Sequence, residues 1–236
     1  MNRATLLLLC IALVGSGAAA DGTVDDVRQW TSLHVSHSYD ERFSFNLLSQ
    51  VRFADDVSDY DETVLKPAVH YIVAPGVKLT LGYHFSSTNN SPDEHRVWEQ
   101  IGLARSFAGF DLGLRGRLEQ RFIHRLGGTI VRNRVRVKVA HALWDSRWYA
   151  VGSEEVLVNL NGLGAGPVSG FEQNRLFGGV GVRLGRRVRV ETGYMWRHSE
   201  HRNAPDESDH ILQLKFFFDD RGRGLLPRTE PDEVND

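Results

Sequence analysis

Basic side chains at alternate positions of two neighbouring segments form the most regular charged pattern in this 236-residue chain. The segments cover residues 112–122 and 131–139. Their charged members are Arg115, Arg117, Glu119, Arg121, Arg132, Arg134, Arg136 and Lys138. Arg175, Arg189 and Glu191 repeat the pattern later in the chain. Residues two apart lie on one face of a β-strand, so we expect these eleven residues to form a charged ladder on one face of a sheet.

The excess of positive charge in the ladder leaves two interpretations open. Like charges on adjacent strands repel, and buried charges need partners or water. Candidate partners are Glu154 or Glu155, Glu191 and Asp111. In the first interpretation, arginines and carboxylates form an internal network that fills the interior. In the second, the positive excess attracts anions and lines a path for small solutes.

Catalytic chemistry is only weakly indicated, at His198, Ser199, Glu200 and His201. This stretch faintly resembles the His/Ser region of outer-membrane lipid A deacylases, in which a histidine activates a serine nucleophile. Adjacent strand residues point to opposite faces, so His198 and Ser199 would diverge, and we predict no enzyme. No P-loop, GxSxG or dinucleotide motif occurs in the sequence. We therefore expect neither a cofactor nor a metal site.

The elements that must position these residues are strands, because apolar residues recur with a period of two. Eleven segments qualify, at about 26–37, 42–53, 63–73, 77–85, 95–107, 112–122, 131–139, 148–160, 175–184, 188–197 and 212–218. Short turns alternate with longer polar loops near 54–62, 86–94, 161–171 and 199–208. Aromatic residues gather toward the strand ends. This pattern predicts an all-β, antiparallel, up-and-down transmembrane β-barrel of about 10–12 strands.

An even strand number is usual for single-chain bacterial barrels, and eleven candidates conflict with that rule. We therefore expect ten spanning strands, with residues 21–38 as a plug or an extra strand. Twelve strands, with one segment left undivided, is the alternative. Glu99 and Arg105 share a face with apolar residues, so we expect them at the rims or beside a bulge that reverses the phase.

The N-terminus predicts export. Residues 1–20 contain a positive start, an apolar run from Leu6 to Val14 and a small-residue cleavage site at Ala18–Ala20, as in a signal peptide. The only cysteine, Cys10, lies within it. We expect a barrel over 21–218, a polar and disordered tail over 219–236, and an outer-membrane location after cleavage near Ala20. The expected partners are outer-membrane lipid and, during biogenesis, the barrel-assembly machinery. The formal net charge of −2 argues against nucleic-acid binding.

Several sequence blocks also resemble one known family. They include residues 81–83, 96–100, 114–122, 132–136, 171–176, 191–194 and 210–214, in order and with suitable spacing. Together they resemble the domain of unknown function 2490 family of bacterial outer-membrane proteins. The resemblance covers most of residues 25–218 and implies a signal peptide and an outer-membrane barrel. It implies no activity and no catalytic residues.

These observations predict a passive role, either as a narrow pore for small, possibly anionic, solutes or as a structural barrel of the envelope. Two alternatives remain. One is a lipid-modifying enzyme active at the barrel rim. The other is a soluble periplasmic ligand-binding barrel, in which the apolar faces would point inward and the ladder would face water.

Overall fold

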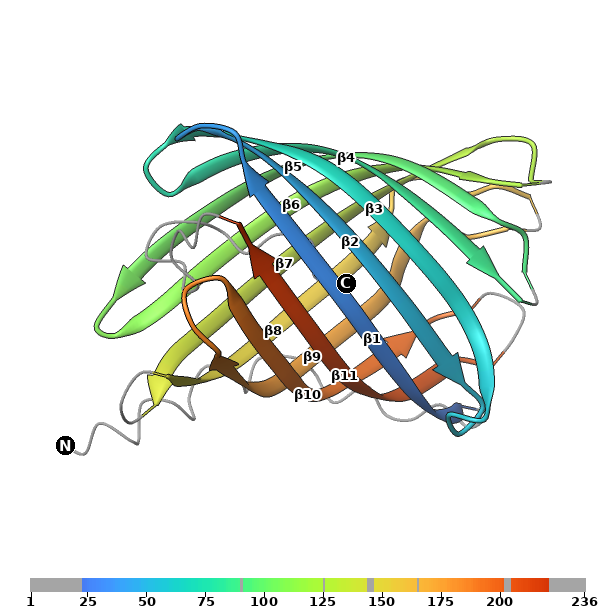
Figure 1. Ribbon diagram of the computed structural model, residues 1–236. Coiled ribbons are helices and arrows are strands. Elements are labelled where there is room, and N and C mark those ends of the chain that lie inside the picture. The colour runs from blue at the N-terminus through green and yellow to red at the C-terminus, as the bar shows by residue number, and fades with distance from the viewer. Residues whose placement is uncertain are drawn as a thin grey trace.

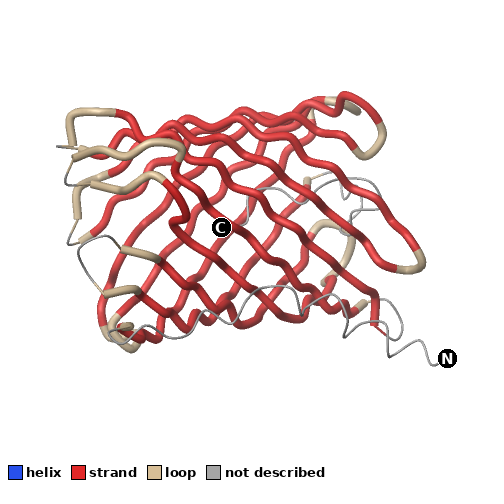
Figure 2. The backbone as a smooth tube through the Cα atoms, turned by 180° about the vertical axis from the view of Figure 1, so that it is seen from behind, coloured by secondary structure: helices blue, strands red, loops and turns tan. Residues whose placement is uncertain are grey.

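The computed structural model describes residues 23–89, 91–124, 126–143, 147–164, 166–201 and 205–220. The predicted signal peptide and residues 221–236 of the predicted tail lie outside these ranges. Strands dominate the described residues (Figures 1 and 2). They are β1 (Val24–Ser38), β2 (Phe43–Ala54), β3 (Asp59–Ala74), β4 (Val77–Thr88), β5 (Glu94–Phe107), β6 (Phe110–Ile123), β7 (Thr129–Leu143), β8 (Trp148–Asn159), β9 (Gly170–Arg183), β10 (Val188–Ser199) and β11 (Glu207–Asp219). No helix long and apolar enough to cross a membrane occurs in the described ranges.

The strands close into a barrel in which sequence neighbours pair antiparallel and β1 pairs with β11 in parallel. Neighbouring strands of an up-and-down sheet alternate in direction, so an odd number makes the first and last strands run the same way. The expected barrel fold and its range of strand number are confirmed. The expectation of an even number is wrong, because residues 24–38 form a full eleventh strand in the wall. Of the two roles expected for residues 21–38, the extra strand is confirmed and the plug is wrong.

Connections of different length mark the two ends of the barrel. One end, the short-turn rim, carries the connections 39–42, 75–76, 108–109, 144–147 and 184–187. The other end, the long-loop rim, carries 55–58, 89–93, 124–128, 160–169 and 200–206. The loop expected over 54–62 is shorter than predicted, because β2 continues to Ala54 and β3 begins at Asp59. At the short-turn rim, Ala108 and Gly109 both have positive φ, as a two-residue hairpin turn requires.

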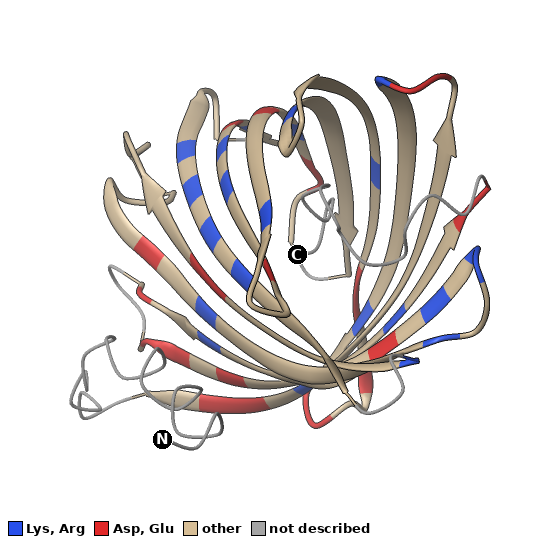
Figure 3. Ribbon diagram, turned by 90° about the vertical axis from the view of Figure 1, so that its left-hand side faces the viewer, with Lys and Arg blue, Asp and Glu red and all other residues tan. Residues whose placement is uncertain are grey.

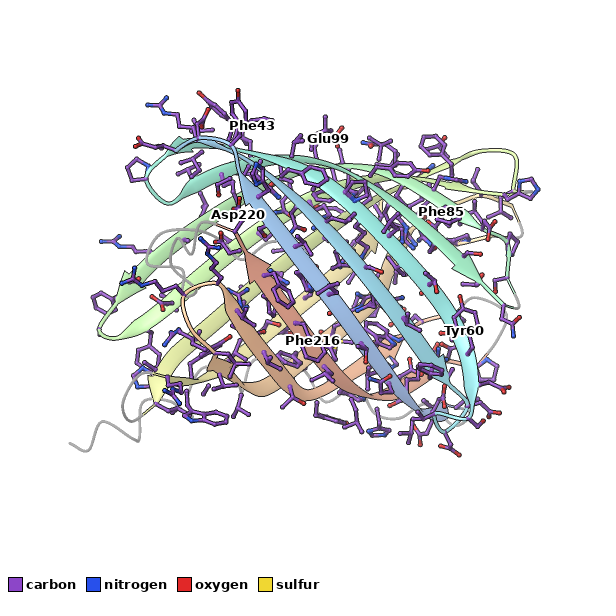
Figure 4. The ribbon with its side chains drawn as sticks, in the orientation of Figure 1. Phe43, Tyr60, Phe85, Glu99, Phe216 and Asp220 are labelled. Carbon is purple, nitrogen blue, oxygen red and sulfur yellow. The ribbon has the colours of Figure 1, made fainter. Side chains whose placement is uncertain are left out.

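The period of two places apolar side chains outside and polar side chains inside. Outward positions such as Leu81, Ile101, Val137 and Leu212 are half exposed, whereas the alternate residues of the same strands are buried (Figure 4). The strands contain 12–16 residues, more than the roughly 9–11 that a tilted strand needs to cross a bilayer.

Glu99 breaks the outward apolar pattern and corrects one expectation. It is exposed on the outer face in the middle of β5 (Figure 4). It lies opposite Leu81 and Leu118, and neither pairing of β5 contains a register shift. It therefore sits neither at a rim nor at a bulge. Its carboxylate instead accepts a hydrogen bond from Gln120 Nε2 at 3.1 Å. Arg105 lies two residues before the end of β5, near the short-turn rim.

Exposed aromatic side chains occur near both ends of the barrel. The short-turn end carries Tyr39, Phe43, Tyr71, Phe107, Trp148 and Phe218, and the long-loop end carries Tyr60, Phe122 and Phe171. Phe43 and Tyr60 mark the two ends in Figure 4. Amphipathic rings at both ends of an apolar band are typical of membrane barrels.

Two glycines make room for large side chains inside the barrel. A Cβ added to Gly82 would lie 2.1 Å from the Trp98 ring, and one added to Gly181 would lie 2.2 Å from the Tyr149 ring. Both rings are almost completely buried. The missing side chains let each ring lie flat against the neighbouring strand, which positions the charged groups described next.

Candidate functional site

All eleven residues of the predicted ladder are buried inside the barrel. Figure 3 shows the positive positions as repeated blue bands along the wall. Among the described residues the buried charges comprise fourteen Lys or Arg side chains and six carboxylates. The carboxylates are Glu62, Glu94, Glu119, Glu155, Glu191 and Asp209. The interior is therefore strongly basic.

Part of the ladder forms a continuous chain of alternating charges, here called the salt-bridge network. Its order is Arg115, Glu155, Arg134, Glu119, Arg132, Glu172, Arg121, Glu94 and Arg96. The chain joins strands β5 to β9 and lies mostly in the long-loop half of the barrel.

The central links of the network are short, and those of Glu119 and Glu155 are fully buried. Arg134 donates to Glu155 Oε2 at 2.7 Å and to Glu119 Oε1 at 2.9 Å. Arg132 donates to Glu119 Oε2 at 2.5 Å and to Glu172 Oε2 at 2.9 Å. Charge-assisted bonds of this length are strong. Each central carboxylate thus accepts from more than one guanidinium, which offsets the cost of burying these charges.

One link of the network crosses several strands. Arg121 on β6 donates to Glu172 Oε1 on β9 at 2.7 Å, although β7 and β8 lie between these strands in the sheet. On its other side, Arg121 donates to Glu94 Oε1 on β5 at 2.5 Å. The network therefore crosses the interior of the barrel from β6 to β9 and narrows the lumen near the long-loop rim.

Buried tryptophans fix two further arginines inside the barrel. The Arg117 guanidinium carbon lies 3.9 Å from the Trp98 ring centroid, and Arg117 also donates to Gln100 Oε1 at 2.7 Å. The Arg52 guanidinium carbon lies 3.9 Å from the Trp30 centroid, and Arg52 is also paired with Glu62. Cation–π contacts hold a guanidinium in one orientation without using a carboxylate.

A second group of buried cations, here called the basic cluster, lies toward the short-turn rim. Its members are Lys78, Lys138, Arg189 and Lys215. Arg136 lies at the middle of β7, opposite Arg115 and Glu155 of the salt-bridge network. Lys78 and Arg189 are the second residues of β4 and β10, and Lys215 is close to the end of β11. The members therefore come from strands all round the barrel wall.

Among the described residues, Glu191 is the one buried carboxylate in the short-turn half of the lumen. Its Oε1 lies 3.9 Å from Lys138 Nζ and 3.7 Å from Arg189 Nε, and it accepts a hydrogen bond from Tyr149 at 2.7 Å. Lys215 is its direct neighbour across the β10–β11 pair. Two half-buried acids, Asp111 and Asp219, lie at the rim itself.

The two halves of the lumen therefore differ in charge. The long-loop half contains nearly all the buried carboxylates and pairs them with arginines. Among the described residues, the short-turn half contains four buried cations and one buried carboxylate, with two half-buried carboxylates at its rim. An anion that enters the short-turn half meets a positive potential inside a wall of low dielectric constant, which strengthens the attraction.

Sequence reasoning identified the ladder but only some of its partners. Glu155 and Glu191 face inward as proposed, whereas Glu154 faces outward and accepts from Asn174 at 3.3 Å. The sequence analysis missed Glu94, the first residue of β5, and Glu172, the third residue of β9. Glu94 could have been predicted from the period of two in β5, because it shares the inward face with Arg96, Trp98 and Gln100.

The candidate catalytic residues are separated by the barrel wall. Ser199 is buried inside, whereas the His198 ring lies outside against Trp196, with 6.0 Å between ring centroids. His201 Nε2 is 3.5 Å from Glu207 at the rim. The described residues contain no group of three or more His, Cys, Asp or Glu side chains that could hold a metal ion.

Comparisons with solved structures support the barrel fold. A structure described as "Bacterial polysaccharide outer membrane secretin" aligns with a TM-score of 0.50 and 12% identity, over 78% of this chain and 67% of that one. A second, titled "Unveiling the Mechanism Behind the in-meso Crystallization of Membrane Proteins", has a TM-score of 0.42 and 12% identity over 87% and 86% of the two chains. The TM-score of the second alignment is too low to support a conclusion about the fold.

Sequence comparisons identify relatives of the whole chain. An uncharacterized protein of Methylorubrum extorquens strain AM1 is 30% identical over 227 residues, which cover 92% of this chain and 98% of the relative. The model of the family "Protein of unknown function (DUF2490)" matches residues 27–208, from β1 to the start of β11. The chain therefore belongs to the DUF2490 family.

Proposed function

We propose that this protein is an outer-membrane β-barrel whose lumen is a narrow pathway for small anions. The observation that carries the proposal is the distribution of charge about the wall. Among the described residues, apolar side chains cover the outside, and fourteen buried cations face six buried carboxylates inside. A soluble ligand-binding barrel would need the opposite arrangement, with its apolar faces inward.

The membrane part of the proposal is supported by three features. These are the outward apolar band, the exposed aromatic rings at both ends, and strands long enough to cross a bilayer. In such barrels short turns face the periplasm and longer loops face outward. This orientation places the basic cluster at the periplasmic end, and outer-membrane lipid contacts the apolar band. Export by a signal peptide over residues 1–20 and insertion by the barrel-assembly machinery belong to the same proposal.

The anion part rests on the asymmetry of the lumen. The basic cluster concentrates anions at one mouth, and the salt-bridge network constricts the other half. A constriction bordered by fixed positive groups favours small anions over cations and excludes large solutes.

Single-channel recording in a planar bilayer tests this function, using protein extracted from the membranes of expressing cells. Under a KCl gradient the reversal potential should indicate anion selectivity. The variant Arg136→Gln/Lys138→Gln should lose most of that selectivity, since it removes two lumen charges. Arg105→Gln, which removes a charge from the outer face, is the matched control and should leave selectivity unchanged. Inserted barrels that carry no current, or that favour cations, would overturn the proposal.

A structural envelope barrel is the second candidate, and the salt-bridge network favours it. An alternating chain of nine charges that satisfies itself is a suitable polar core for a closed barrel. Loss of envelope integrity in a deletion strain, combined with a silent barrel in the bilayer, would support this role over the pore.

We further propose that the barrel has no enzymatic activity at its rim. Ser199 and His198 face opposite sides of the wall, so His198 cannot activate Ser199. Incubation with labelled outer-membrane lipid should give no hydrolysis. Hydrolysis that disappears in Ser199→Ala would contradict this statement.

A further inference from the structure

The outer wall of β5, β6 and β7 carries three polar side chains within the apolar band. Glu99 on β5 and Asn133 on β7 are exposed, and Gln120 on β6 is half-buried. Apolar outward residues of the same strand lie on both sides of Glu99 and of Asn133, so neither side chain is at a rim. Figure 4 shows Glu99 pointing away from the barrel. Polar groups therefore interrupt the lipid-facing surface on these strands.

The three polar side chains surround one leucine. Leu118 on β6 is the direct neighbour of Glu99 on one side and of Asn133 on the other. Gln120 is the next outward residue of β6, and it donates to Glu99 Oε2 at 3.1 Å. Leu118, Glu99, Gln120 and Asn133 are here called the polar patch. They form one continuous surface on three adjacent strands.

Much of the hydrogen-bonding capacity of the polar patch is unused. Among the residues that the structure describes, neither the Asn133 carboxamide nor Glu99 Oε1 has a hydrogen-bond partner. Lipid tails accept and donate no hydrogen bonds, so unpaired polar groups in the hydrocarbon region cost free energy. Contact with protein would satisfy these groups, whereas contact with lipid tails leaves them unpaired.

Two other outward polar sites of the wall are satisfied within the chain. Glu154 accepts from Asn174 Nδ2 at 3.3 Å, and Asn174 is only 7% exposed. Thr192 Oγ1 donates to the Gln213 carbonyl at 3.1 Å. The polar patch differs from both sites, because its donor and its acceptor are exposed and have unused capacity.

We propose that the polar patch is the interface through which two copies of this chain associate in the membrane. A two-fold axis normal to the membrane passes over Leu118. Because Glu99 and Asn133 lie on opposite sides of Leu118, this axis puts the Glu99 of each copy on the same side as the partner's Asn133. The carboxamide of each copy then donates to the carboxylate of the other, and the two Leu118 side chains pack at the centre.

The arrangement of the polar patch favours a second copy over a different protein. Its acceptor and its donor lie one strand to either side of Leu118, so the surface is complementary to itself, as an isologous dimer requires. Contact between outer walls leaves the lumen and both rims of each barrel uncovered. The dimer therefore goes beyond the proposed anion pathway and does not depend on it.

Disulfide trapping through a single cysteine tests the interface. Cys10 is the only cysteine in the sequence and lies in the predicted signal peptide. Leu118→Cys, reconstituted in phosphatidylcholine vesicles at high lipid excess, should form covalent dimers under mild oxidation. Leu33→Cys is the matched control, since Leu33 is similarly exposed (41% against 38%) on β1, across the barrel from β6. Equal cross-linking of both variants, or none of Leu118→Cys, would overturn the proposal.

The role of the polar groups is tested in the Leu118→Cys protein. Asn133→Leu removes the donor and should reduce the cross-linked fraction severalfold, whereas Asn133→Gln keeps a carboxamide and should retain the dimer. Glu99→Gln keeps an acceptor oxygen and should retain the dimer too. Heat-modifiable migration on gels verifies that each variant is folded. Undiminished cross-linking of folded Asn133→Leu would overturn association through the polar patch.

Subunit counting provides a readout without cysteine. Protein labelled once per chain at its amino terminus should bleach in two steps in dilute vesicles, and Glu99→Leu/Asn133→Leu should bleach in one. Thr192→Leu replaces an outward polar residue elsewhere on the wall and should keep two steps. One-step bleaching of the natural sequence, including a monomer that cross-links to a different protein in cells, would overturn the proposal. Conductance enters none of these tests, so failure of the dimer and failure of the proposed pore are distinguished.

Discussion

At the residue scale, the decisive feature is the number of guanidinium groups that each buried carboxylate serves. Glu119 is 1% exposed and accepts hydrogen bonds from Arg132 and Arg134. Its oxygens also lie 3.6 Å from Arg117 Nη1 and 3.9 Å from Arg96 Nη1. Four guanidinium groups therefore share one carboxylate, so this side chain should tolerate substitution less than any surface acid.

The variant Glu119→Gln should lower the free energy of unfolding by roughly 3–5 kcal/mol, because it removes a buried carboxylate that four guanidinium groups share. Urea unfolding in lipid vesicles, followed by tryptophan fluorescence, measures this loss. Glu99→Gln makes the same chemical change on the outer face and should leave the midpoint unchanged. Equal midpoints for the two variants would show that the network does not stabilise the barrel.

Glycine at position 82 is required by a neighbouring ring rather than by backbone conformation. Gly82→Ala should destabilise the barrel by about 1–3 kcal/mol, because the alanine Cβ would overlap the Trp98 ring and push that ring out of its contact with Arg117. Gly178→Ala is the control, because no heavy atom lies within 4 Å of a Cβ there. The same unfolding assay detects the difference, and a shift in tryptophan emission should accompany it only in Gly82→Ala.

At the element scale, the parallel pair β1–β11 is the unusual feature. Thirteen residue pairs of these strands are in continuous register, from Val24 with Glu207 to Ser36 with Asp219. Parallel pairing is slightly weaker per residue than antiparallel pairing, but it leaves no open sheet edge. Closure also brings Trp30 into the lumen, where it stacks on Arg52.

Cysteine pairs can verify this closure. Thr31→Cys with Leu214→Cys should form an intramolecular disulfide, since the two residues are direct partners. Thr31→Cys with Phe218→Cys lies on the same face but four residues out of register, roughly 13 Å away along the strand, and should not. Cross-linking of neither pair would indicate that residues 24–38 do not form a wall strand.

At the scale of the whole molecule, the outside of the barrel must match its solvent. Outward leucines and valines occupy the middle of the wall, with aromatic rings toward both ends. In water this surface would be an exposed apolar patch far larger than monomeric proteins usually carry. In a bilayer the same surface is solvated by lipid, and the polar lumen is screened from it by the wall.

The variant Leu81→Arg should therefore impair insertion into lipid vesicles by about 2–4 kcal/mol, as expected for a charge deep in the bilayer. Leu184→Arg, in a connection at the short-turn rim, should insert as well as the natural protein. Heat-modifiable migration on gels measures the folded fraction. Equal folding of both variants in lipid would contradict a membrane-spanning wall.

Much of the architecture followed from the sequence because strand periodicity is a local property. Alternation placed the eleven ladder residues on one face, and the strand ranges and family resemblance agree with the structure. The expected even strand number was wrong because it depends on which two edge strands pair to close the barrel, and these are β1 and β11. Residues 24–38 have ordinary strand alternation, and only their pairing with β11 identifies them as part of the wall.

The sequence by itself determined that the chain forms strands with one apolar and one charged face, since side-chain direction along a strand follows from backbone geometry. Tertiary structure decided which charges neutralise one another. Glu172 joins Arg121 only because β6 and β9 approach each other inside a closed wall. Closure also separated the paired charges of the long-loop half from the basic cluster of the short-turn half. Such separation depends on distances between strands far apart in the chain, which local patterns do not encode.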